Sequence, residues 1–146
     1  MAIDIESWKS VLTQMEGTNR TGLSMPEREL LNYVEREWKV AMRLVERANR
    51  EMEAKRWFDA ISAFFQLLQR ANAAYSYLFQ PSLLSTVNND SVKETVNRVL
   101  GVLTDTVIGF VQELKASSKE IGLESVTLST SAFPPTLNVS VVVKNA

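Results

Sequence analysis

The segment that most constrains the fold of this chain is residues 57–79, WFDAISAFFQLLQRANAAYSYLF. It carries charge at two positions, Asp59 and Arg70. If the segment is helical, apolar and aromatic side chains lie on almost every side of it. Such a helix is stable in water when other elements cover it on most sides. The segment therefore predicts a central helix in a mainly α fold.

Three further segments repeat apolar residues at steps of three and four, the spacing of one helix face. The longest has a clear start, because Ser24 is followed three residues later by Glu27, the pattern of a capping box. Another is rich in β-branched residues and holds Gly101 and Gly109, yet its periodicity favours a helix. With the central segment they predict a bundle of about four helices over residues 1–122. The three segments are residues 4–16, 24–53 and about 92–117.

The last of these helices has two candidate N-terminal caps. Ser91 and Glu94 repeat the capping-box spacing, and Asp90 beside them is an alternative cap. Gly122 is the expected stop at the other end, because glycine commonly follows the last helical residue.

The C-terminal residues 123–146 have a different pattern. Segments 125–130 and 136–143 alternate in polarity and are β-branched, as expected for strands. Pro134 and Pro135 lie between them and cannot donate ladder hydrogen bonds, so we place both in the turn. The pattern predicts a β-hairpin appended to the same domain.

An isolated hairpin is marginal in water, and its open edges invite another strand. One solution pairs two hairpins across a two-fold axis, which would make the chain a homo-oligomer, with a dimer favoured. In the other solution, the hairpin covers its own bundle and keeps solvated edges. The edge could also add a strand to a different protein. The candidate oligomerisation residues, on one face of the second strand, are Leu137, Val139, Val141 and Val143.

The residue types that are missing limit the chemistry. The chain has neither cysteine nor histidine, which excludes disulfides and thiolate nucleophiles and removes the commonest general base and metal ligand. No Gly-rich phosphate loop or nucleophile motif is present. The aromatic residues cluster in and around the central segment, at a spacing that fits a helical core rather than a cofactor pocket. They are Trp38, Trp57, Phe58, Phe64, Phe65, Tyr75, Tyr77 and Phe79. We therefore expect no catalytic site, no metal and no cofactor; an enzyme built on carboxylates or lysine is the last of our hypotheses.

A stripe of cations lies opposite the apolar face of residues 24–53. At 100° per residue its members fall within about 80°, along about 21 Å of helix. Such a stripe fits a phosphate backbone or an acidic partner, although the net charge of the chain is -1. It also fits a solvated face with Glu35–Lys39, Glu46–Arg50 and Glu51–Lys55 pairs. The stripe residues are Arg36, Lys39, Arg43, Arg47 and Arg50.

Targeting features are absent from the sequence as given. The N-terminal residues lack the basic region and apolar run of a secretory signal. No segment reaches the roughly 18 apolar residues that a membrane-spanning helix needs. We expect a cytoplasmic protein that makes no membrane contact.

Residues 41–71 resemble the helical hairpins of tetratricopeptide repeats, MIT domains and HEPN domains. The resemblance rests on small and aromatic residues around the turn KRWFDA: Ala41, Ala48, Ala60, Phe64 and Ala71. The HEPN resemblance would imply RNA binding or cleavage, but the catalytic motif of that family needs a histidine, which this chain lacks. What the resemblance implies is an interaction module.

These observations predict a non-enzymatic interaction or assembly protein that self-associates. The alternative is a helical subunit of a nucleoprotein complex that contacts RNA or DNA backbone through the arginine stripe.

Overall fold

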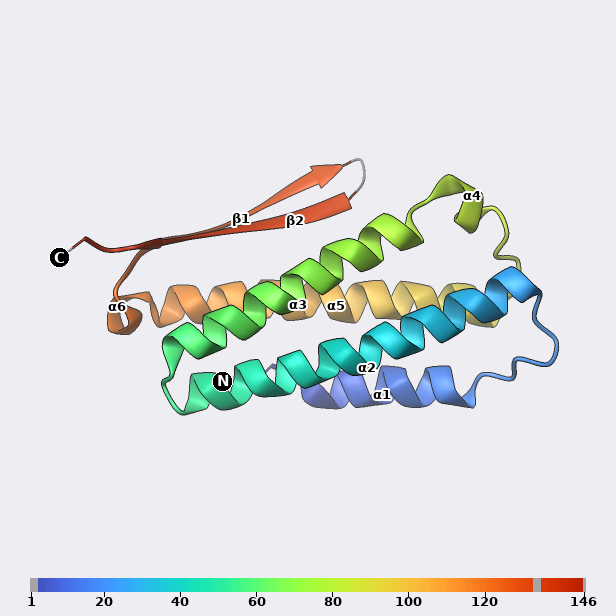
Figure 1. The fold of residues 1–146 in the computed structure, drawn as a ribbon, viewed down its shortest axis with the longest axis horizontal. Helices are drawn as coiled ribbons and strands as arrows, with labels where there is room; N and C mark the ends of the chain where they lie inside the picture. The colour runs from blue at the N-terminus through green and yellow to red at the C-terminus, as the bar shows by residue number, and fades with distance from the viewer. Residues whose placement is uncertain (1–2, 133–134, 146) are drawn as a thin grey trace.

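A computed structural model describes residues 3–132 and 135–145. Its long helices alternate in direction, so that sequence neighbours lie antiparallel, and the hairpin follows them along one side (Figure 1). In chain order the elements are α1 (Ile5–Gly17), α2 (Met25–Glu53), α3 (Trp57–Leu78), α4 (Pro81–Leu84), α5 (Asp90–Ala116), α6 (Ser118–Ile121), β1 (Leu123–Ala132) and β2 (Pro135–Val143).

The predicted mainly α bundle with a C-terminal hairpin is confirmed, and the helix count needs correcting. The described residues form four long helices and, in addition, the four-residue helices α4 and α6. Both are single turns in connecting segments, which are too short to show a repeating apolar pattern. Gly122 follows α6 with a φ of 89°, a left-handed conformation that glycine adopts without steric cost.

The helix starts depend on side-chain caps, and one prediction about them is wrong. The capping box at α2 is present: Ser24 Oγ accepts from the backbone N–H of Glu27, and Glu27 Oε1 accepts from that of Ser24 at 3.1 Å. At α5 the cap is Asn89, whose Oδ1 accepts from Val92 N at 3.2 Å, and not Ser91 or Asp90. Asparagine caps as well as aspartate does, and Asn89 lies directly before the two predicted candidates.

Glu27 also ties two distant segments together. Its second carboxylate oxygen accepts the backbone N–H groups of Asn88 at 3.0 Å and Asn89 at 2.7 Å, just before α5. The side chain is buried, with 5% of its surface exposed. Because these backbone groups, with those of Ser24, favour the charged form, the pKa of Glu27 falls to about 2.

Two tryptophans form the polar and aromatic centre of the core. The rings of Trp8 and Trp38 stack with centroids 3.9 Å apart. Trp38 Nε1 donates to the carbonyl oxygen of Trp8 at 2.9 Å, and Trp8 Nε1 donates to Thr106 Oγ1 at 2.8 Å. This arrangement links α1, α2 and α5, and both indole N–H groups have partners, as buried N–H groups require.

The expectation that α3 is covered on most sides holds in part. The helix packs against α2, α5 and β2, and one strip facing solvent remains. Ser62, Gln66 and Gln69 lie on that strip, and Phe58 in the first turn is 78% exposed. The polar residues at steps of three and four were a signal of this exposed side.

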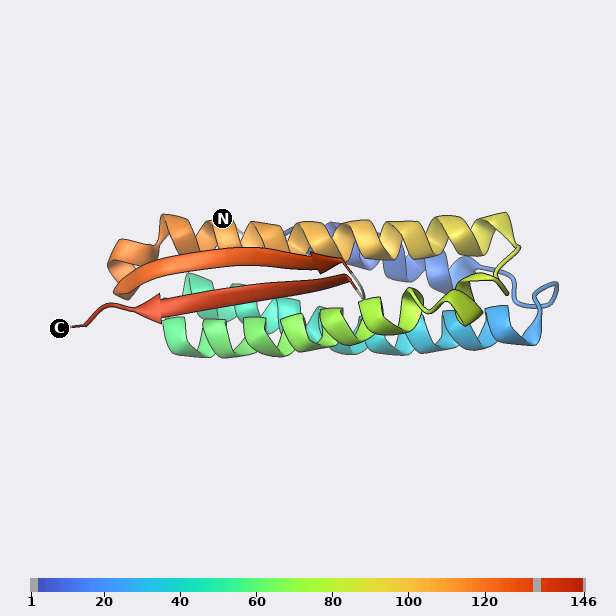
Figure 2. The ribbon, with the colours of Figure 1, turned by 90° about the horizontal axis from the view of Figure 1, so that it is seen from above.

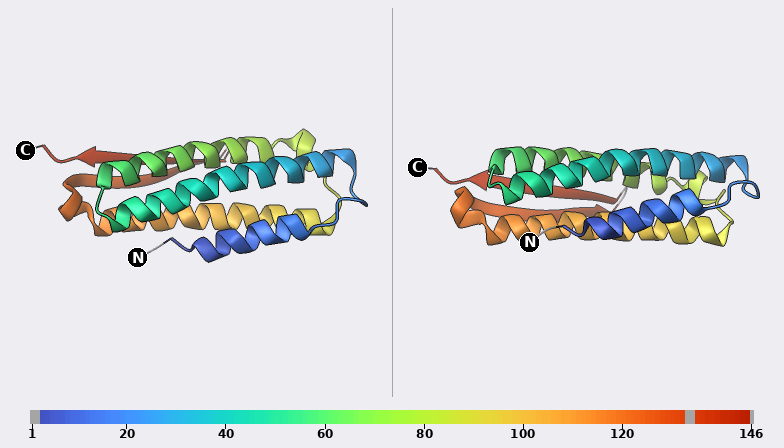
Figure 3. Two further views of the ribbon diagram at one scale, coloured as in Figure 1. Left: turned by 60° about the horizontal axis from the view of Figure 1, so that its bottom comes forward. Right: turned by 90° about the horizontal axis from the view of Figure 1, so that it is seen from below.

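The hairpin lies over the space between α3 and α5 and closes the core there (Figure 2). β1 contacts α5 and α6, whereas β2 contacts α3. Leu123, Val126 and Leu137 are buried in the same core as the helices. The side of the bundle away from the hairpin is covered by α1, which packs on α2 and α5 (Figure 3).

The turn of the hairpin differs in part from the prediction. Pro135 is the first residue of β2 and lies opposite Ala132, rather than in the turn. A proline is tolerated there because its missing N–H costs no ladder bond at the start of a strand. Pro134 lies outside the described residues.

Candidate interaction surfaces

A side-chain amide on α3 binds the backbone of strand β2. Asn72, on α3, accepts the backbone N–H of Leu137 on its Oδ1 at 2.9 Å and donates its Nδ2 to the carbonyl oxygen of Leu137, also at 2.9 Å. The amide thus takes the place of a neighbouring strand. Both backbone groups of Leu137 must therefore point away from β1.

The direction of the Leu137 backbone determines which groups of β2 are free. Backbone groups alternate along a strand, so those of Val139, Val141 and Val143 also point away from β1. Lys144 is an even-numbered residue and points the other way. Its N–H donates to the carbonyl oxygen of Gly122, on the β1 side, at 2.9 Å. Within the described chain, the outward groups of the three valines have no hydrogen-bond partner. We call this row, residues 139–143 of β2, the free edge.

The predicted oligomerisation residues differ in their surroundings. Leu137 is buried, and the side chains of Val139 and Val141 pack half-buried against the core. Val143 is 56% exposed, and Val142 on the opposite face is 41% exposed. The side-chain face therefore largely covers the bundle of its own chain, as one of the two alternatives expected. The outward backbone groups of residues 139–143 remain without a hydrogen-bond partner in the described part of the chain.

The arginine stripe lies along the solvent side of α2. Arg36 lies over the ring of Tyr33, 5.7 Å from its centroid. Arg43 and Arg47 are exposed, and neither has an ion-pair partner in the part of the chain that the structure describes. The predicted Glu35–Lys39 pair is present, with Lys39 Nζ 3.6 Å from Glu35 Oε2.

Two other predicted pairs on this helix are replaced by different ones. Arg50 lies 3.9 Å from Glu51 rather than beside Glu46. Glu51 also binds Arg56 in the turn after the helix, and this hydrogen bond lowers its pKa. Lys55 pairs instead with Glu120 of α6, at 3.0 Å. The helix ends at Glu53, and Lys55 has a φ of 59°, so helical spacing does not extend to it.

The glutamates beside the stripe belong to contacts with neighbouring elements. Glu35 lies 3.1 Å from Arg20 in the α1–α2 connection, and Glu37 accepts from Arg70 of α3 at 2.8 Å. These pairs stabilise the packing of α2 against its neighbours. The central part of the stripe keeps its positive charge, because Arg43 and Arg47 are not included in these pairs.

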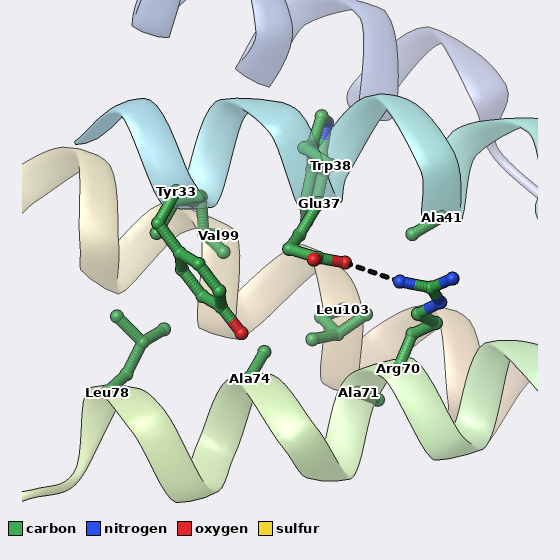
Figure 4. Close-up of a pocket in the computed structure, with 11 residues that line it drawn as sticks. Tyr33, Glu37, Trp38, Ala41, Arg70, Ala71, Ala74, Leu78, Val99 and Leu103 are labelled. Carbon is green, nitrogen blue, oxygen red and sulfur yellow. Dashed lines mark hydrogen bonds and ion pairs between the residues drawn. The ribbon is translucent and has the colours of Figure 1, made fainter. Parts of the chain in front are cut away.

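A small cavity lies beneath the Glu37–Arg70 pair, between α2, α3 and α5 (Figure 4). Its walls are apolar and include Ala41, Ala71 and Ala74. The volume is about 20 Å³, roughly the space of one water molecule. Since no ligand of larger size fits, we interpret it as a packing gap beside the small residues that bring α2 close to α3.

Two larger clefts also lack catalytic chemistry. A cleft of about 320 Å³ between α1 and α5 contains Asp4 and Asp105, but Asp4 is used as the cap of α1, where it accepts from Ser7. A cleft of about 210 Å³ at the hairpin tip contains the hydrogen-bonded hydroxyls of Tyr75 and Thr104. Among the described residues there is no cluster of three or more potential metal ligands.

Comparisons with known proteins provide no family for this chain. No protein-family model, curated protein or solved structure matches it. The resemblance of residues 41–71 to tetratricopeptide, MIT and HEPN hairpins therefore stays a prediction. None of the helices in the described residues has the length and apolar character needed to cross a bilayer.

Asn72 is the residue that sequence reasoning missed. It is a mid-helix amide in a charge-poor segment, and nothing in the sequence around it distinguishes it from a solvent-facing residue. Its role depends on the position of the hairpin, which no local pattern encodes.

Proposed function

We propose that this chain is a non-enzymatic assembly module that self-associates through the free edge of β2. The observation that supports the proposal is the row of backbone groups at Val139, Val141 and Val143 that have no partner among the residues the structure describes. Native proteins usually protect such an edge with a charge, a proline, a bulge or a covering element. Residues 139–143 include no charged residue and no proline; Pro135 lies at the start of the strand, and the irregularity in the ladder is on β1, opposite Val142 and Val143.

Two exposed apolar side chains lie on the free edge itself. Val142 and Val143 end β2 and are exposed, whereas Met25 and Leu84 are exposed at the opposite end of the bundle. A second chain paired with the free edge would cover Val142 and Val143 in addition to the backbone. Burial of exposed apolar side chains favours association.

The proposal is tested by blocking the edge without breaking the hairpin. In Val141→Pro, the lost N–H is one that points away from β1, so the β1–β2 ladder keeps its bonds. We expect the wild type to elute as a dimer in size-exclusion chromatography with light scattering, and this variant to elute as a monomer with unchanged helical circular dichroism.

Two further variants separate edge pairing from general damage. Val142→Lys adds a charge to the exposed face of the edge strand and should also give a folded monomer. Ser140→Pro removes an N–H on the β1 side, so it should loosen the hairpin itself and lower stability. A wild type that stays monomeric, or a dimer that survives both edge variants, would contradict the proposal.

Arg43 and Arg47 support a second candidate function, contact with a nucleic-acid backbone. Both are exposed cations without an ion-pair partner among the described residues. Guanidinium groups form forked contacts with phosphate. In this function the chain would be a helical subunit of a nucleoprotein complex, with Arg36, Lys39 and Arg50 beside the central pair.

The test of this second function is fluorescence anisotropy with labelled single-stranded and double-stranded oligonucleotides. Wild-type binding should weaken as salt rises, because phosphate contacts release counterions. The double variant Arg43→Glu/Arg47→Glu should abolish binding and leave the oligomeric mass unchanged. Equal binding by wild type and variant would exclude the stripe as the site.

A further inference from the structure

We infer that the dimer is an antiparallel β2–β2 pair whose two-fold axis passes beside Val141, and that Asn72 sets this register. The inference rests on the proposed self-association and specifies its geometry. Its partner is a second copy of this chain, and it assigns Asn72 a positioning role.

Backbone direction restricts how two free edges can pair. In an antiparallel pair, residues that exchange hydrogen bonds lie directly opposite each other, and both must point outward. On β2 the outward residues have odd numbers, from the contacts of Leu137 and Lys144. An odd residue must therefore lie opposite an odd residue of the second copy. If the register were shifted by one residue, each odd residue would lie opposite an even residue. The N–H and carbonyl groups of the even residues point toward β1 and are not available to a second strand.

Asn72 limits the pairing at one end of the edge. Its amide already occupies the N–H and the carbonyl of Leu137, so a second strand cannot bind there. At the other end, β2 stops at Val143. The outward residues left between these limits are Val139, Val141 and Val143.

One register uses all three free positions in both copies. It places Val141 opposite Val141 of the second copy, and Val139 opposite Val143. Shifting the axis to Ser140 would place Val143 opposite the occupied Leu137. Shifting it to Val142 would place Val139 opposite Asn145, beyond the end of β2.

The side chains agree with self-pairing. On the exposed face, Val142 lies opposite Ser140 of the second copy, and Lys144 lies opposite Asn138, so no like charges meet across the axis. On the bundle face, the exposed Val143 lies against Val139. Because both copies use the same surface, the contact is isologous, and it closes after two chains.

The experiment uses single cysteines, since the natural chain has none. In the inferred register the two Val141 Cα atoms are about 5.5 Å apart, within the disulfide range of about 4.4–6.8 Å. Two copies of residue 140, or of residue 142, lie on a diagonal at about 7–8 Å. We expect Val141→Cys to form a covalent dimer under mild oxidant several-fold faster than Ser140→Cys or Val142→Cys.

The positioning role of Asn72 has its own readout. Asn72→Ala frees the backbone of Leu137 and lengthens the edge, which favours an axis at Ser140. Cross-linking of Ser140→Cys should therefore rise in the Asn72→Ala background, and that of Val141→Cys should fall. If Asn72 only stabilised the hairpin, its replacement by alanine would not shift cross-linking from residue 141 to residue 140.

The outcomes distinguish the register from the proposed function. A dimeric mass with fastest cross-linking at residue 140 or 142, or with no cross-link at any of the three, overturns the register and leaves self-association intact. A monomeric mass for the unmodified chain overturns both. A dimeric mass with fastest cross-linking at residue 141, and the exchange in Asn72→Ala, supports the inference.

Discussion

The interior of the bundle and the free edge of β2 differ in how their polar groups are satisfied. In the interior, the indole N–H groups of Trp8 and Trp38 have protein partners, and the carboxylate of Glu27 accepts four hydrogen bonds. Among the described residues, no buried side-chain nitrogen or oxygen lacks a partner. Along the free edge, the outward backbone groups of Val139, Val141 and Val143 have no partner within residues 3–132 and 135–145.

The difference separates residues that hold the fold from residues available to a partner. A buried polar group without a partner costs free energy, so the interior tolerates little change. The edge groups are satisfied by water and can exchange it for another strand. Changes in the interior should therefore alter stability, and changes at the edge should alter association.

The largest effect should come from the tryptophan pair. Trp8→Ala removes a fully buried, stacked ring that also donates to Thr106, and we expect a loss of about 3–5 kcal/mol in the free energy of unfolding. Urea denaturation followed by circular dichroism measures it. Phe58→Ala is the matched aromatic control, and its exposed ring should change stability by at most about 0.5 kcal/mol. Equal losses in the two variants would contradict the assigned core.

The next effect is the pH dependence due to Glu27. Its folded pKa is lowered from 4.5 to about 2, so its charged form stabilises the fold fully above about pH 4.5, and this contribution disappears as the pH falls toward 2. At pH 7, Glu27→Gln should unfold at a lower urea concentration than the wild type, because the side-chain NH₂ group of glutamine would face backbone N–H groups, which are also donors. The difference in the free energy of unfolding between the two proteins should shrink between pH 4.5 and 2.

Glu29→Gln is the control for this titration, because it makes the same chemical change on an exposed side chain of the same turn. It should stay close to the wild type throughout. A constant gap between Glu27→Gln and the wild type down to pH 2 would show that Glu27 is not bound as described.

A smaller, local effect is expected at the junction of the two regions. Asn72→Ala removes both hydrogen bonds to Leu137 and should cost about 1–3 kcal/mol, at roughly 0.5–1.5 kcal/mol per bond. Amide hydrogen exchange should accelerate most in β2 and little in α1. Gln69→Ala, on the solvent side of the same helix, should leave exchange unchanged. Uniform acceleration across all elements would argue against a local clamp.

The smallest effect on stability is expected at the arginine stripe. Arg43→Glu/Arg47→Glu changes exposed side chains without ion-pair partners in the described chain, so stability should shift by at most about 0.5 kcal/mol. Thermal unfolding measures this shift, and the oligomeric mass should not change. A large loss of stability would mean that the two arginines hold the fold.

The sequence predicted those features that follow from local spacing. The capping box at Ser24 and the apolar stripes of the long helices are local patterns, and both are present. It did not predict the contacts that join segments distant in the chain. The clamp from Asn72 to Leu137 and the bonds from Glu27 to Asn88 depend on how the elements pack.

The candidate sites show the same limit. Helical periodicity placed Arg36, Arg43 and Arg47 on one face of α2. It did not predict which of these arginines have an interaction partner. For β2, alternation predicted the face that packs against the bundle, whereas the free backbone groups follow from the contact of Leu137 with a different helix. A strand pattern describes side chains, and it does not say which edge of the strand is covered.

Association through the free edge of β2 can be measured by light scattering on a size-exclusion column for wild type and Val141→Pro, with absorbance at 260 and 280 nm recorded on each peak. We expect a wild-type dimer without nucleic acid and a folded monomeric variant. A wild-type monomer at every concentration loaded would contradict this expectation.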